Sequence, residues 1–377
     1  MQQEHPHGYV EETPELRAFY GDLERLSAAP LWTMLESMMP DHPMPKARPF
    51  LWQWEQIRPQ LIRAGQLVTP ERANRRVIVL CNPGLPGQGC ASQCFQANVQ
   101  MVLPGEIAPA HRHSASAIRF IMEGRGAYTA VDGEKTLMYP GDLVLTPNWT
   151  WHDHGNDTDE PMIWQDGLDV PLVNRLDGMF YEAYRGMQQE YTRPVNASSH
   201  AFGQGGLYPT WEKWTAPHSP LLNYSWESTR EALARAGKEA PGTRWDGICM
   251  EYVNPVTGGP MMPTMAGNAQ LLRPGEHTQA HRHTKDVIYH VVEGSGYTVV
   301  SGVRFDWKKH DIFVIPKWAL HEHANGSRTA DACLFSYNDQ PVMQALGLYR
   351  EEELLENDGY QVVTGTFSPP VTRLGSS

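Results

Sequence analysis

The first part of the chain has the spacing of amphipathic helices. Between Glu15 and about Gly65 the apolar residues recur three or four positions apart, which places them on one face of an α-helix. The clearest series is Leu16, Phe19, Tyr20, Leu23 and Leu26. We therefore predict a helical N-terminal arm over residues 1–75.

The pattern changes at residues 76–80, which read Arg-Val-Ile-Val-Leu, and stays different to about Trp164. Apolar or alternating runs are short there and are separated by glycine and proline, as in the strands of a β-sandwich or barrel. We predict a first β domain over residues 76–170. A similar stretch from about Asp246 to Tyr337 predicts a second one over residues 246–345.

Two other segments differ from these domains. Residues 171–245 mix Tyr, Trp, Gly and Pro and contain one helical stretch, at Thr229–Gly237. So many aromatic residues predict a connection that packs on a barrel, because a free linker is usually polar. Residues 346–377 form a polar tail, in which we predict a short helix at Tyr349–Leu355.

An internal repeat relates the two strand-rich regions. Leu103–His113 and Arg273–His283 share the pattern Pro-Gly-Glu followed by Ala-His-Arg-His, and His281 follows His111 by 170 residues. Each copy continues to a Pro-x-Trp-x-x-His-x-His motif, at residues 147–154 and 316–323. From the second histidine to the third the spacing is 39 residues in one copy and 38 in the other. Two copies of one domain explain these matches.

Three histidines in each copy have the spacing of a metal site. They are His111, His113 and His152 in the first copy, and His281, His283 and His321 in the second. Side chains alternate along a strand, so a His-x-His pair presents both imidazoles on one face, where a third histidine can join them. Three imidazoles leave positions open for water, substrate or oxygen. A lone histidine is more often an ordinary residue, but a triplet that occurs twice favours metal binding.

Composition narrows the classes of partner. A length of 377 residues suits two domains, and 31 basic against 43 acidic residues give a net charge of −12. This charge argues against binding to nucleic acid or to an anionic membrane. The five cysteines have no repeated spacing and are interpreted as reduced thiols. We find no signal-peptide pattern and no run of about 18 apolar residues, and therefore predict a soluble, cytoplasmic protein.

The histidine motifs resemble those of the bicupins in the gentisate dioxygenase family, which includes salicylate and 1-hydroxy-2-naphthoate dioxygenases. The residues that match the two cupin motifs of the first copy are Gly105, His111, His113, Gly124, Gly141, Pro147, His152 and Asn156. The resemblance covers nearly the whole chain. It implies a mainly β fold of two double-stranded β-helix (jelly-roll) barrels, a bicupin, with a helical N-terminal arm.

One element of the cupin pattern is missing. Many cupins add a glutamate a few residues after His-x-His as a fourth ligand, but the sequence has Ala117-Ile118 and Val287-Ile288 there. Three neutral imidazoles leave the full dipositive charge on a metal, which suits chelation of a carboxylate and an adjacent hydroxyl. The resemblance implies Fe(2+) as the metal. We expect metal in both barrels, and the alternative for the second is an ion that only stabilises the fold.

Arg119 is the first candidate for substrate binding. It has the same parity as His111 and His113, so an unbroken strand would direct it into the same cavity. There its planar guanidinium could hold a carboxylate through two hydrogen bonds. The alternative is a salt-bridged arginine on the surface. The repeat puts Tyr289 at this position in the second copy, so ring cleavage is expected mainly in the first.

The resemblance supplies further candidates. In the family, two arginines before the first barrel contribute to the active site, which points to Arg72 and Arg76. Arg75 is a rival, and a surface ion pair of Arg72 with Glu71 is the alternative. His154 resembles a histidine that hydrogen-bonds a ring hydroxyl or bound oxygen.

Two more parts of the chain complete the predicted site. Asp166 is expected to follow the barrel and to orient one of these groups, with a solvated loop carboxylate as the alternative. Gln96, Ala97 and Asn98 fall where relatives vary the wall of the substrate pocket, and this stretch differs from the salicylate-type wall.

The resemblance implies an Fe(2+)-dependent dioxygenase that uses O2 to open the ring of gentisate (2,5-dihydroxybenzoate) and gives maleylpyruvate. Salicylate and 1-hydroxy-2-naphthoate remain alternative substrates. A metal-dependent isomerase and a non-catalytic ligand-binding bicupin are further alternatives, although intact metal motifs disfavour the latter. The resemblance also implies a homotetramer that acts in the catabolism of aromatic compounds.

Overall fold

The computed structural model describes residues 13–69 and 75–370. Contacts divide the chain into two units, Met1–Met44 and Pro45–Ser377. In the first unit the elements are α1 (Pro14–Arg25), η1 (Leu31–Thr33) and α2 (Leu35–Met38). Thr13 caps α1, because its Oγ1 accepts a hydrogen bond of 3.2 Å from the Leu16 amide. Helices α1 and α2 confirm helical structure in the arm.

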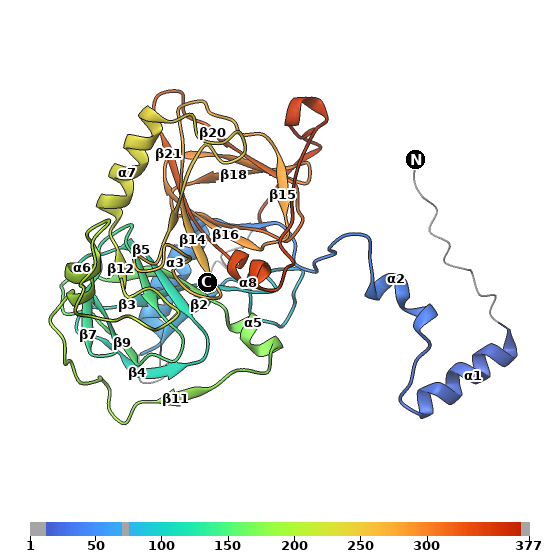
Figure 1. Ribbon diagram of the computed structural model, residues 1–377, viewed down its shortest axis with the longest axis horizontal. Coiled ribbons are helices and arrows are strands. Elements are labelled where there is room, and N and C mark those ends of the chain that lie inside the picture. Colours follow the sequence, from blue (N-terminus) through green and yellow to red (C-terminus); the bar gives the residue numbers. More distant parts are fainter. Residues whose placement is uncertain (1–12, 70–74, 371–377) are drawn as a thin grey trace. The chain divides into compact units, whose positions relative to one another are not determined.

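The second unit contains two barrels, each made of two sheets that are antiparallel except where β18 pairs with β23 (Figure 1). The first barrel has sheets in the order β12-β8-β5-β10-β3-β2 and β11-β4-β9-β6-β7. Its strands are β2 (Arg76–Val79), β3 (Gln96–Val102), β4 (Ile107–His113), β5 (Ala117–Glu123), β6 (Tyr128–Val131), β7 (Glu134–Leu137), β8 (Leu143–Thr146), β9 (His152–Gly155) and β10 (Met162–Leu168).

The connecting segment takes part in the first barrel. Its elements are α5 (Val170–Arg175), β11 (Tyr181–Ala183), α6 (Ala197–Phe202), β12 (Asn223–Tyr224) and α7 (Trp226–Glu239). Strand β11 pairs with β4, and β12 pairs with β8. Helix α7, which packs on β13 and β14, confirms the helix expected at Thr229–Gly237.

The second barrel repeats the first. Its sheets run β1-β19-β16-β21-β14-β13 and β22-β15-β20-β17-β18-β23. Its strands are β13 (Ile248–Tyr252), β14 (Ala266–Leu272), β15 (His281–His283), β16 (Val287–Glu293), β17 (Ser295–Val300), β18 (Val303–Lys308), β19 (Ile312–Ile315), β20 (His321–Asn325) and β21 (Ala332–Asn338). The tail adds α8 (Gln340–Ala345), β22 (Glu351–Glu353), η2 (Asn357–Gly359) and β23 (Gly365–Thr366).

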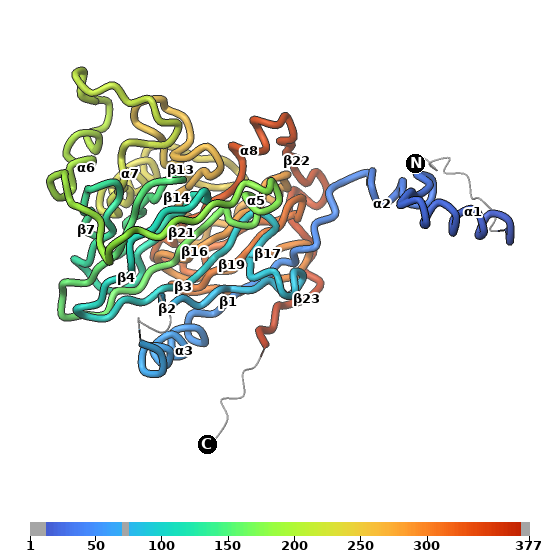
Figure 2. Tube along the Cα trace, turned by 90° about the horizontal axis from the view of Figure 1, so that it is seen from below, coloured from blue at the N-terminus to red at the C-terminus, as the bar shows by residue number. Residues whose placement is uncertain are grey.

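Two local predictions were wrong. The helix expected at Tyr349–Leu355 is strand β22, whose residues pair with His281–His283 of β15. Glutamate favours helices only weakly, so a tertiary strand partner overrides its preference. Within the arm, residues 50–52 form β1, which pairs with β19, because Leu51 is buried in the core of the second barrel. Helix α3 (Trp54–Leu67) follows and lies against β2 and β3 (Figure 2).

The two barrels share one hydrophobic core. The sheet that contains β5 packs through its outward face on the sheet that contains β21, and the rings of Phe120 on β5 and Phe335 on β21 stack at 4.4 Å. A loop of each barrel also contacts a buried carboxylate of the other barrel. Thr264, before β14, donates a hydrogen bond to Asp169 at the end of β10. Cys94, at the equivalent point before β3, lies beside Asp286 and Asp339 of the second barrel, with one polar side-chain atom of each within 4.8 Å of the others.

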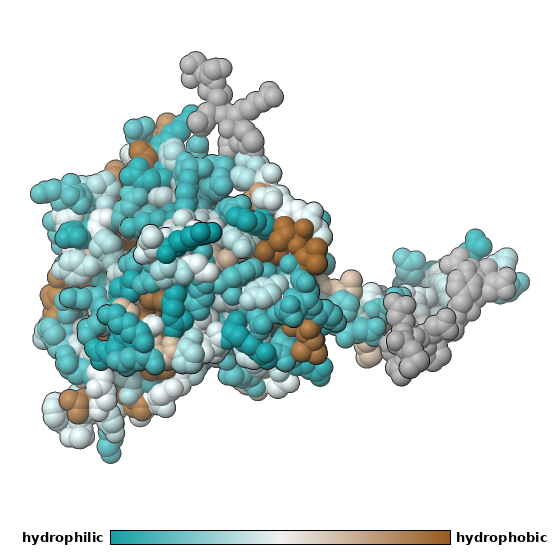
Figure 3. Space-filling view, turned by 90° about the horizontal axis from the view of Figure 1, so that it is seen from above, coloured by the Kyte–Doolittle hydropathy of each residue, from teal (hydrophilic) through white to brown (hydrophobic). Residues whose placement is uncertain are grey.

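Figure 3 shows how polar and apolar side chains are distributed over one face of the molecule. This face is mostly hydrophilic, and apolar side chains form small separate patches on it. Among the described residues no helix has the length and apolar character needed to cross a membrane.

Candidate metal centres and active site

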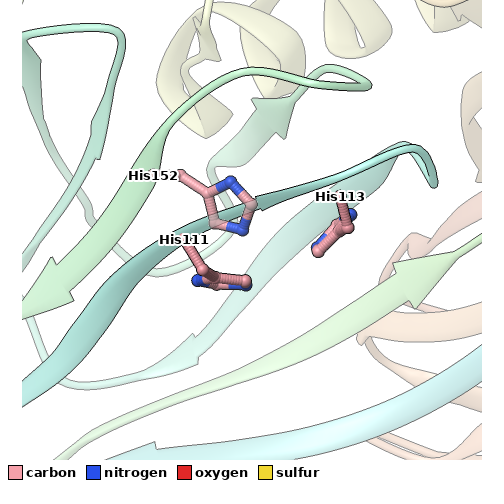
Figure 4. A group of neighbouring side chains, drawn as sticks. All are labelled: His111, His113 and His152. Carbon is pink, nitrogen blue, oxygen red and sulfur yellow. The ribbon is translucent and has the colours of Figure 1, made fainter. Parts of the chain in front are cut away.

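Three histidines meet inside the first barrel. His111 and His113 lie on β4, and His152 lies opposite His111 on β9. Figure 4 shows their rings converging on one point. The ring centroids are 4.1 Å apart for His111 and His152, 4.8 Å for His113 and His152, and 5.3 Å for His111 and His113. One nitrogen from each ring lies within 4.8 Å of the others.

Backbone carbonyls fix the orientation of these rings. The Nδ1 atoms of His113 and His152 donate to carbonyl oxygens two residues away, at 2.7 and 2.9 Å, so the Nε2 atoms of these rings carry the lone pair that a metal needs. The Nδ1 atom of His111 lies 3.2 Å from the Pro109 carbonyl oxygen and 2.5 Å from Arg75 Nη2. The Nε2 atom of His152 is buried and has no hydrogen-bond partner. A divalent cation fits this donor set.

Burial keeps these imidazoles neutral. It lowers the pKa of His111 to about 2 and that of His113 to about 4, and nearby positive charge on Arg75 adds to both shifts. The pKa of His152 also lies well below its usual value because the ring is buried. Neutral imidazole is the form that binds metal, so protons compete weakly for this site.

Arg119 lies beside the histidines and is buried inside the barrel. It faces Asp166 across the β5–β10 pair, with 3.4 Å between Arg119 Nε and Asp166 Oδ1. The indole N–H of Trp164 donates to the same carboxylate oxygen at 2.9 Å. Burial raises the pKa of Asp166, while Arg119 opposes this shift. Asp166 is thus an interior residue of β10 and does not lie on a loop after the barrel.

His154 belongs to the same network. Arg119 Nη2 donates to His154 Nε2 at 2.9 Å, so the ring proton lies on Nδ1, which donates to Thr129 Oγ1 at 3.0 Å. Burial holds the pKa of His154 well below its usual value. The structure therefore brings Arg119, His154 and Asp166 together next to the histidine cluster.

The arginines at the start of β2 do not all point to the site as expected. Arg76 turns away from the histidines, pairs with Glu106 and donates to the Val68 carbonyl at 2.9 Å. Neighbouring residues point in opposite directions along a strand, and it is Arg75 that reaches the site. Its Nη1 atom lies 2.8 Å from His111 Nε2, and its Nη2 atom donates to the Pro109 carbonyl at 3.0 Å. Arg72 lies outside the described residues.

Strand β3 carries the predicted wall residues Gln96 and Asn98, and it adds Gln100, which the sequence analysis missed. Gln96 donates to the Gly89 carbonyl at 3.0 Å and is partly exposed. Asn98 faces Asp166 across β10, and Gln100 faces Trp164. Asn98 Oδ1 and Gln100 Nε2 are buried without a hydrogen-bond partner. The sequence signal for this set was the alternation of polar residues at positions 96, 98 and 100. Buried polar atoms without a protein partner are candidates for contact with a ligand.

The second barrel holds an equivalent histidine cluster. His281 and His283 lie on β15 and His321 on β20, with ring centroids 4.4 to 5.4 Å apart. Backbone carbonyls accept from Nδ1 of His283 at 3.2 Å and of His321 at 3.0 Å. His321 Nε2 and His281 Nδ1 are buried without partners. This donor set also fits a divalent cation.

The surroundings of the second cluster are different. Tyr289 and Ser336 face each other on β16 and β21, where the first barrel has Arg119 and Asp166. His323 keeps the hydrogen bond of its counterpart His154, with Nδ1 2.9 Å from Thr298 Oγ1. Its Nε2 atom, however, is buried without a partner. Tyr289 thus stands in the second barrel where the first barrel has Arg119.

Comparison with known proteins gives a consistent result. A model of the cupin domain matches residues 98–171 and 269–337. The chain is 44% identical to gentisate 1,2 dioxygenase 1 of Aquipseudomonas alcaligenes, over 90% of this chain and 96% of that protein. It is 42% identical to 5-aminosalicylate 1,2-dioxygenase of a Comamonas species, over 94% of each chain.

A solved structure is similarly close. The salicylate 1,2-dioxygenase of Pseudoaminobacter salicylatoxidans, in its adduct with gentisate, matches with a TM-score of 0.87 and 36% identity. The match covers 93% of this chain and 97% of that one.

Proposed function

This chain belongs to the gentisate 1,2-dioxygenase family of bicupins, and we therefore propose that it opens the ring of gentisate with O2 to give maleylpyruvate. Both oxygen atoms enter the product. The observation that carries this proposal is the buried histidine cluster of the first barrel, which lies beside Arg119, His154 and Asp166. The second barrel lacks the arginine and the carboxylate, so the reaction belongs to the first.

Iron(II) is the metal that we propose for the first barrel, held by Nε2 of His111, His113 and His152. When bound, it supplies electron transfer between substrate and oxygen, and it can chelate the carboxylate and the neighbouring hydroxyl. The support from this chain is the set of three neutral, oriented imidazoles without a carboxylate ligand. Such a set leaves room for two reactants.

Arg75 and Arg119 bind and orient the anionic substrate. Arg119 is buried in the first barrel and Arg75 is partly buried there, and Asp166 is the acidic group paired with Arg119. Two guanidinium groups against one carboxylate leave an excess of positive charge, which attracts an aromatic acid into an otherwise acidic protein. Asp166 holds Arg119 through Nε, so that its outer nitrogens can turn to the substrate carboxylate.

His154 handles a proton. Its Nε2 atom accepts from Arg119, and it becomes free to accept a hydroxyl proton from the substrate once Arg119 turns to the carboxylate. The depressed pKa keeps this atom unprotonated beforehand. Asn98 and Gln100 present their unpartnered polar atoms to the same cavity and contribute to ring recognition.

Other parts of the proposal concern the whole protein. We propose a second metal ion on His281, His283 and His321. We also propose a cytoplasmic homotetramer, for which the exposed apolar residues of the arm offer a contact surface. Those with an exposed fraction above half are Leu26, Leu31, Trp32, Met38, Met39 and Met44.

A salicylate-type substrate is the second candidate. The relative that is 42% identical acts, by its name, on 5-aminosalicylate, which carries an amino group where gentisate has its second hydroxyl. Discrimination between the two depends on the wall formed by Gln96, Asn98 and Gln100.

Oxygen uptake by anaerobically iron-loaded protein tests the function. Gentisate, 5-aminosalicylate, salicylate and 1-hydroxy-2-naphthoate are offered in parallel, and the ring-opened product is followed by absorbance. Uptake equal to gentisate consumed, and lost in His111→Ala, supports the proposal. Turnover under nitrogen would favour an isomerase, and no uptake with any acid would favour a ligand-binding protein.

A further inference from the structure

Strands β11 and β22 occupy the same place in the two barrels. In the first barrel β11 pairs with β4, so that Tyr181 faces His113. In the second barrel β22 pairs with β15, so that Glu351 faces His283. Glu351 follows Tyr181 by 170 residues, which is the spacing of the whole repeat. The two residues are therefore structural counterparts at the rim of each histidine cluster.

The chemistry at this position differs between the barrels. The ring centroid of Tyr181 lies 5.4 Å from that of His111, which makes this position part of the rim above the first histidine. Glu351 instead brings a carboxylate to the second cluster, and its Oε1 atom lies 3.9 Å from His281 Nε2. The hydroxyl of Tyr349 donates to the other oxygen, Oε2, at 2.9 Å. Tyr349 therefore orients the carboxylate of Glu351, whose side chain is 44% exposed, and leaves Oε1 facing His281.

The side chains around the second cluster carry less positive charge than those around the first. Tyr289 and Ser336 replace Arg119 and Asp166. The strand register that aligns Arg76 with Ile248 also puts Gly247 in the place of Arg75. The second site has thus lost both arginines that face the first cluster and has gained a carboxylate at its rim.

We propose that Glu351 is a fourth ligand of the ion in the second barrel, which makes this centre a three-histidine, one-carboxylate site. The proposal rests on the second metal ion of the proposed function. The glutamate that the cupin motif lacks is supplied by a strand from the C-terminal tail. One carboxylate reduces the net charge of the site and occupies one position that a substrate would need. The second barrel therefore keeps its ion and does not bind aromatic acids.

Metal binding to the full chain tests this role. A His152→Ala background weakens the first site, and Mn(2+) titrated into the protein is followed by the EPR signal of the free ion. In this background we expect Glu351→Gln to weaken binding at the second site at least about tenfold, because removal of a ligand costs no less than loss of an outer-sphere partner. Tyr349→Phe, a positioning change, should give a smaller loss.

Glu352→Gln is the matched control. Glu352 is the next residue on β22, is exposed and pairs with Arg282 on the outside of the barrel, so its loss should leave Mn(2+) affinity unchanged. Equal affinities in Glu351→Gln and Glu352→Gln would overturn the proposal. Wild-type protein that binds one ion per chain would also overturn it, together with the second ion of the proposed function. Oxygen uptake by that same wild-type protein reports separately on ring cleavage in the first barrel.

Discussion

Arg119 and Asp166 face each other across β5 and β10, and the corresponding pair in the second barrel is Tyr289 and Ser336. Both members of the pair therefore differ between the barrels. A buried arginine without its carboxylate, or the reverse, would leave an uncompensated charge at a cost of several kcal/mol, about 3–5. Because both members of the pair differ, neither barrel buries one of these charges without its partner.

Replacing Arg119 by lysine should impair catalysis more than folding. Lysine keeps the charge but cannot form the planar, two-pronged contact with a carboxylate. Loss of one charged hydrogen bond predicts a fall in kcat/KM for gentisate of about ten- to hundredfold. Steady-state oxygen uptake measures this change. Arg112→Lys, at a partly exposed residue paired with Glu182, is the control, and an equal loss in both variants would contradict the assignment.

Arg75 and Arg76 should respond in opposite ways to the change to glutamine. Arg75→Gln removes a cation from the site and should lower kcat/KM by about tenfold or more. It also removes a repulsion, since nearby Arg119 and burial together lower the pKa of Arg75 to about 10, so stability should not fall. Arg76→Gln leaves Glu106 unpaired and should cost about 1–3 kcal/mol of unfolding free energy.

Urea unfolding and oxygen uptake, measured on both variants, separate these effects. If Arg76→Gln lost activity while Arg75→Gln lost stability, the two roles would have to be exchanged.

The metal-free protein should lose stability as the pH falls below about 6.5. In the native state burial lowers the pKa of His113 to about 4 and that of His281 to about 3, so the unfolded chain takes up protons first. Each such histidine contributes fully to stability above pH 6.5. Its contribution falls by up to about 1.4 kcal/mol per pH unit until the native pKa is reached.

His113→Gln should therefore flatten the dependence of unfolding free energy on pH, between pH 6 and 4.5, by up to about 1.4 kcal/mol per unit. Urea melts across this range measure the slope. His200→Gln, at an exposed residue of α6, should leave the slope unchanged. A parallel curve for His113→Gln would show that the pKa of His113 is the same in the native and unfolded states, which would contradict the prediction.

Chelation should lower the melting temperature and abolish oxygen uptake together. An ion that binds only the native state stabilises it by mass action, by about 2.7 kcal/mol at a hundred times its dissociation constant. Iron(II) should restore both properties, whereas Zn(2+) should restore the melting temperature alone, because zinc has no redox chemistry. Calorimetry on the same samples distinguishes the two effects, and activity with zinc would exclude a redox role for the metal.

Much of the site could be predicted because short-range rules govern it. The alternation of side chains brings His111 and His113 to one face, and the same parity places Arg119 in the cavity. The repeat then transfers the whole histidine arrangement to the second barrel. Each of these inferences needs only the period of a strand.

The features that the sequence analysis predicted wrongly depend on where a strand begins and on which strands pair. Whether Arg75 or Arg76 enters the site depends on the start of β2, which composition does not determine. Residues 351–353 favour a helix locally but form a strand, because β15 offers an unpaired edge. Both cases are decided by contacts far away in the sequence, which override weak local preferences.

The exchange of loops between the barrels has a consequence for folding. Asp169 accepts hydrogen bonds from the Ser116 amide at 2.7 Å and from Thr264 of the other barrel, while Asp339 is approached by Cys94 in the reverse direction. Each half thus completes the buried polar contacts of the other. We therefore expect the two barrels to unfold in a single cooperative transition, and we expect neither to fold on its own. The second barrel then supports the fold of the first, whatever chemistry its own histidine cluster carries out.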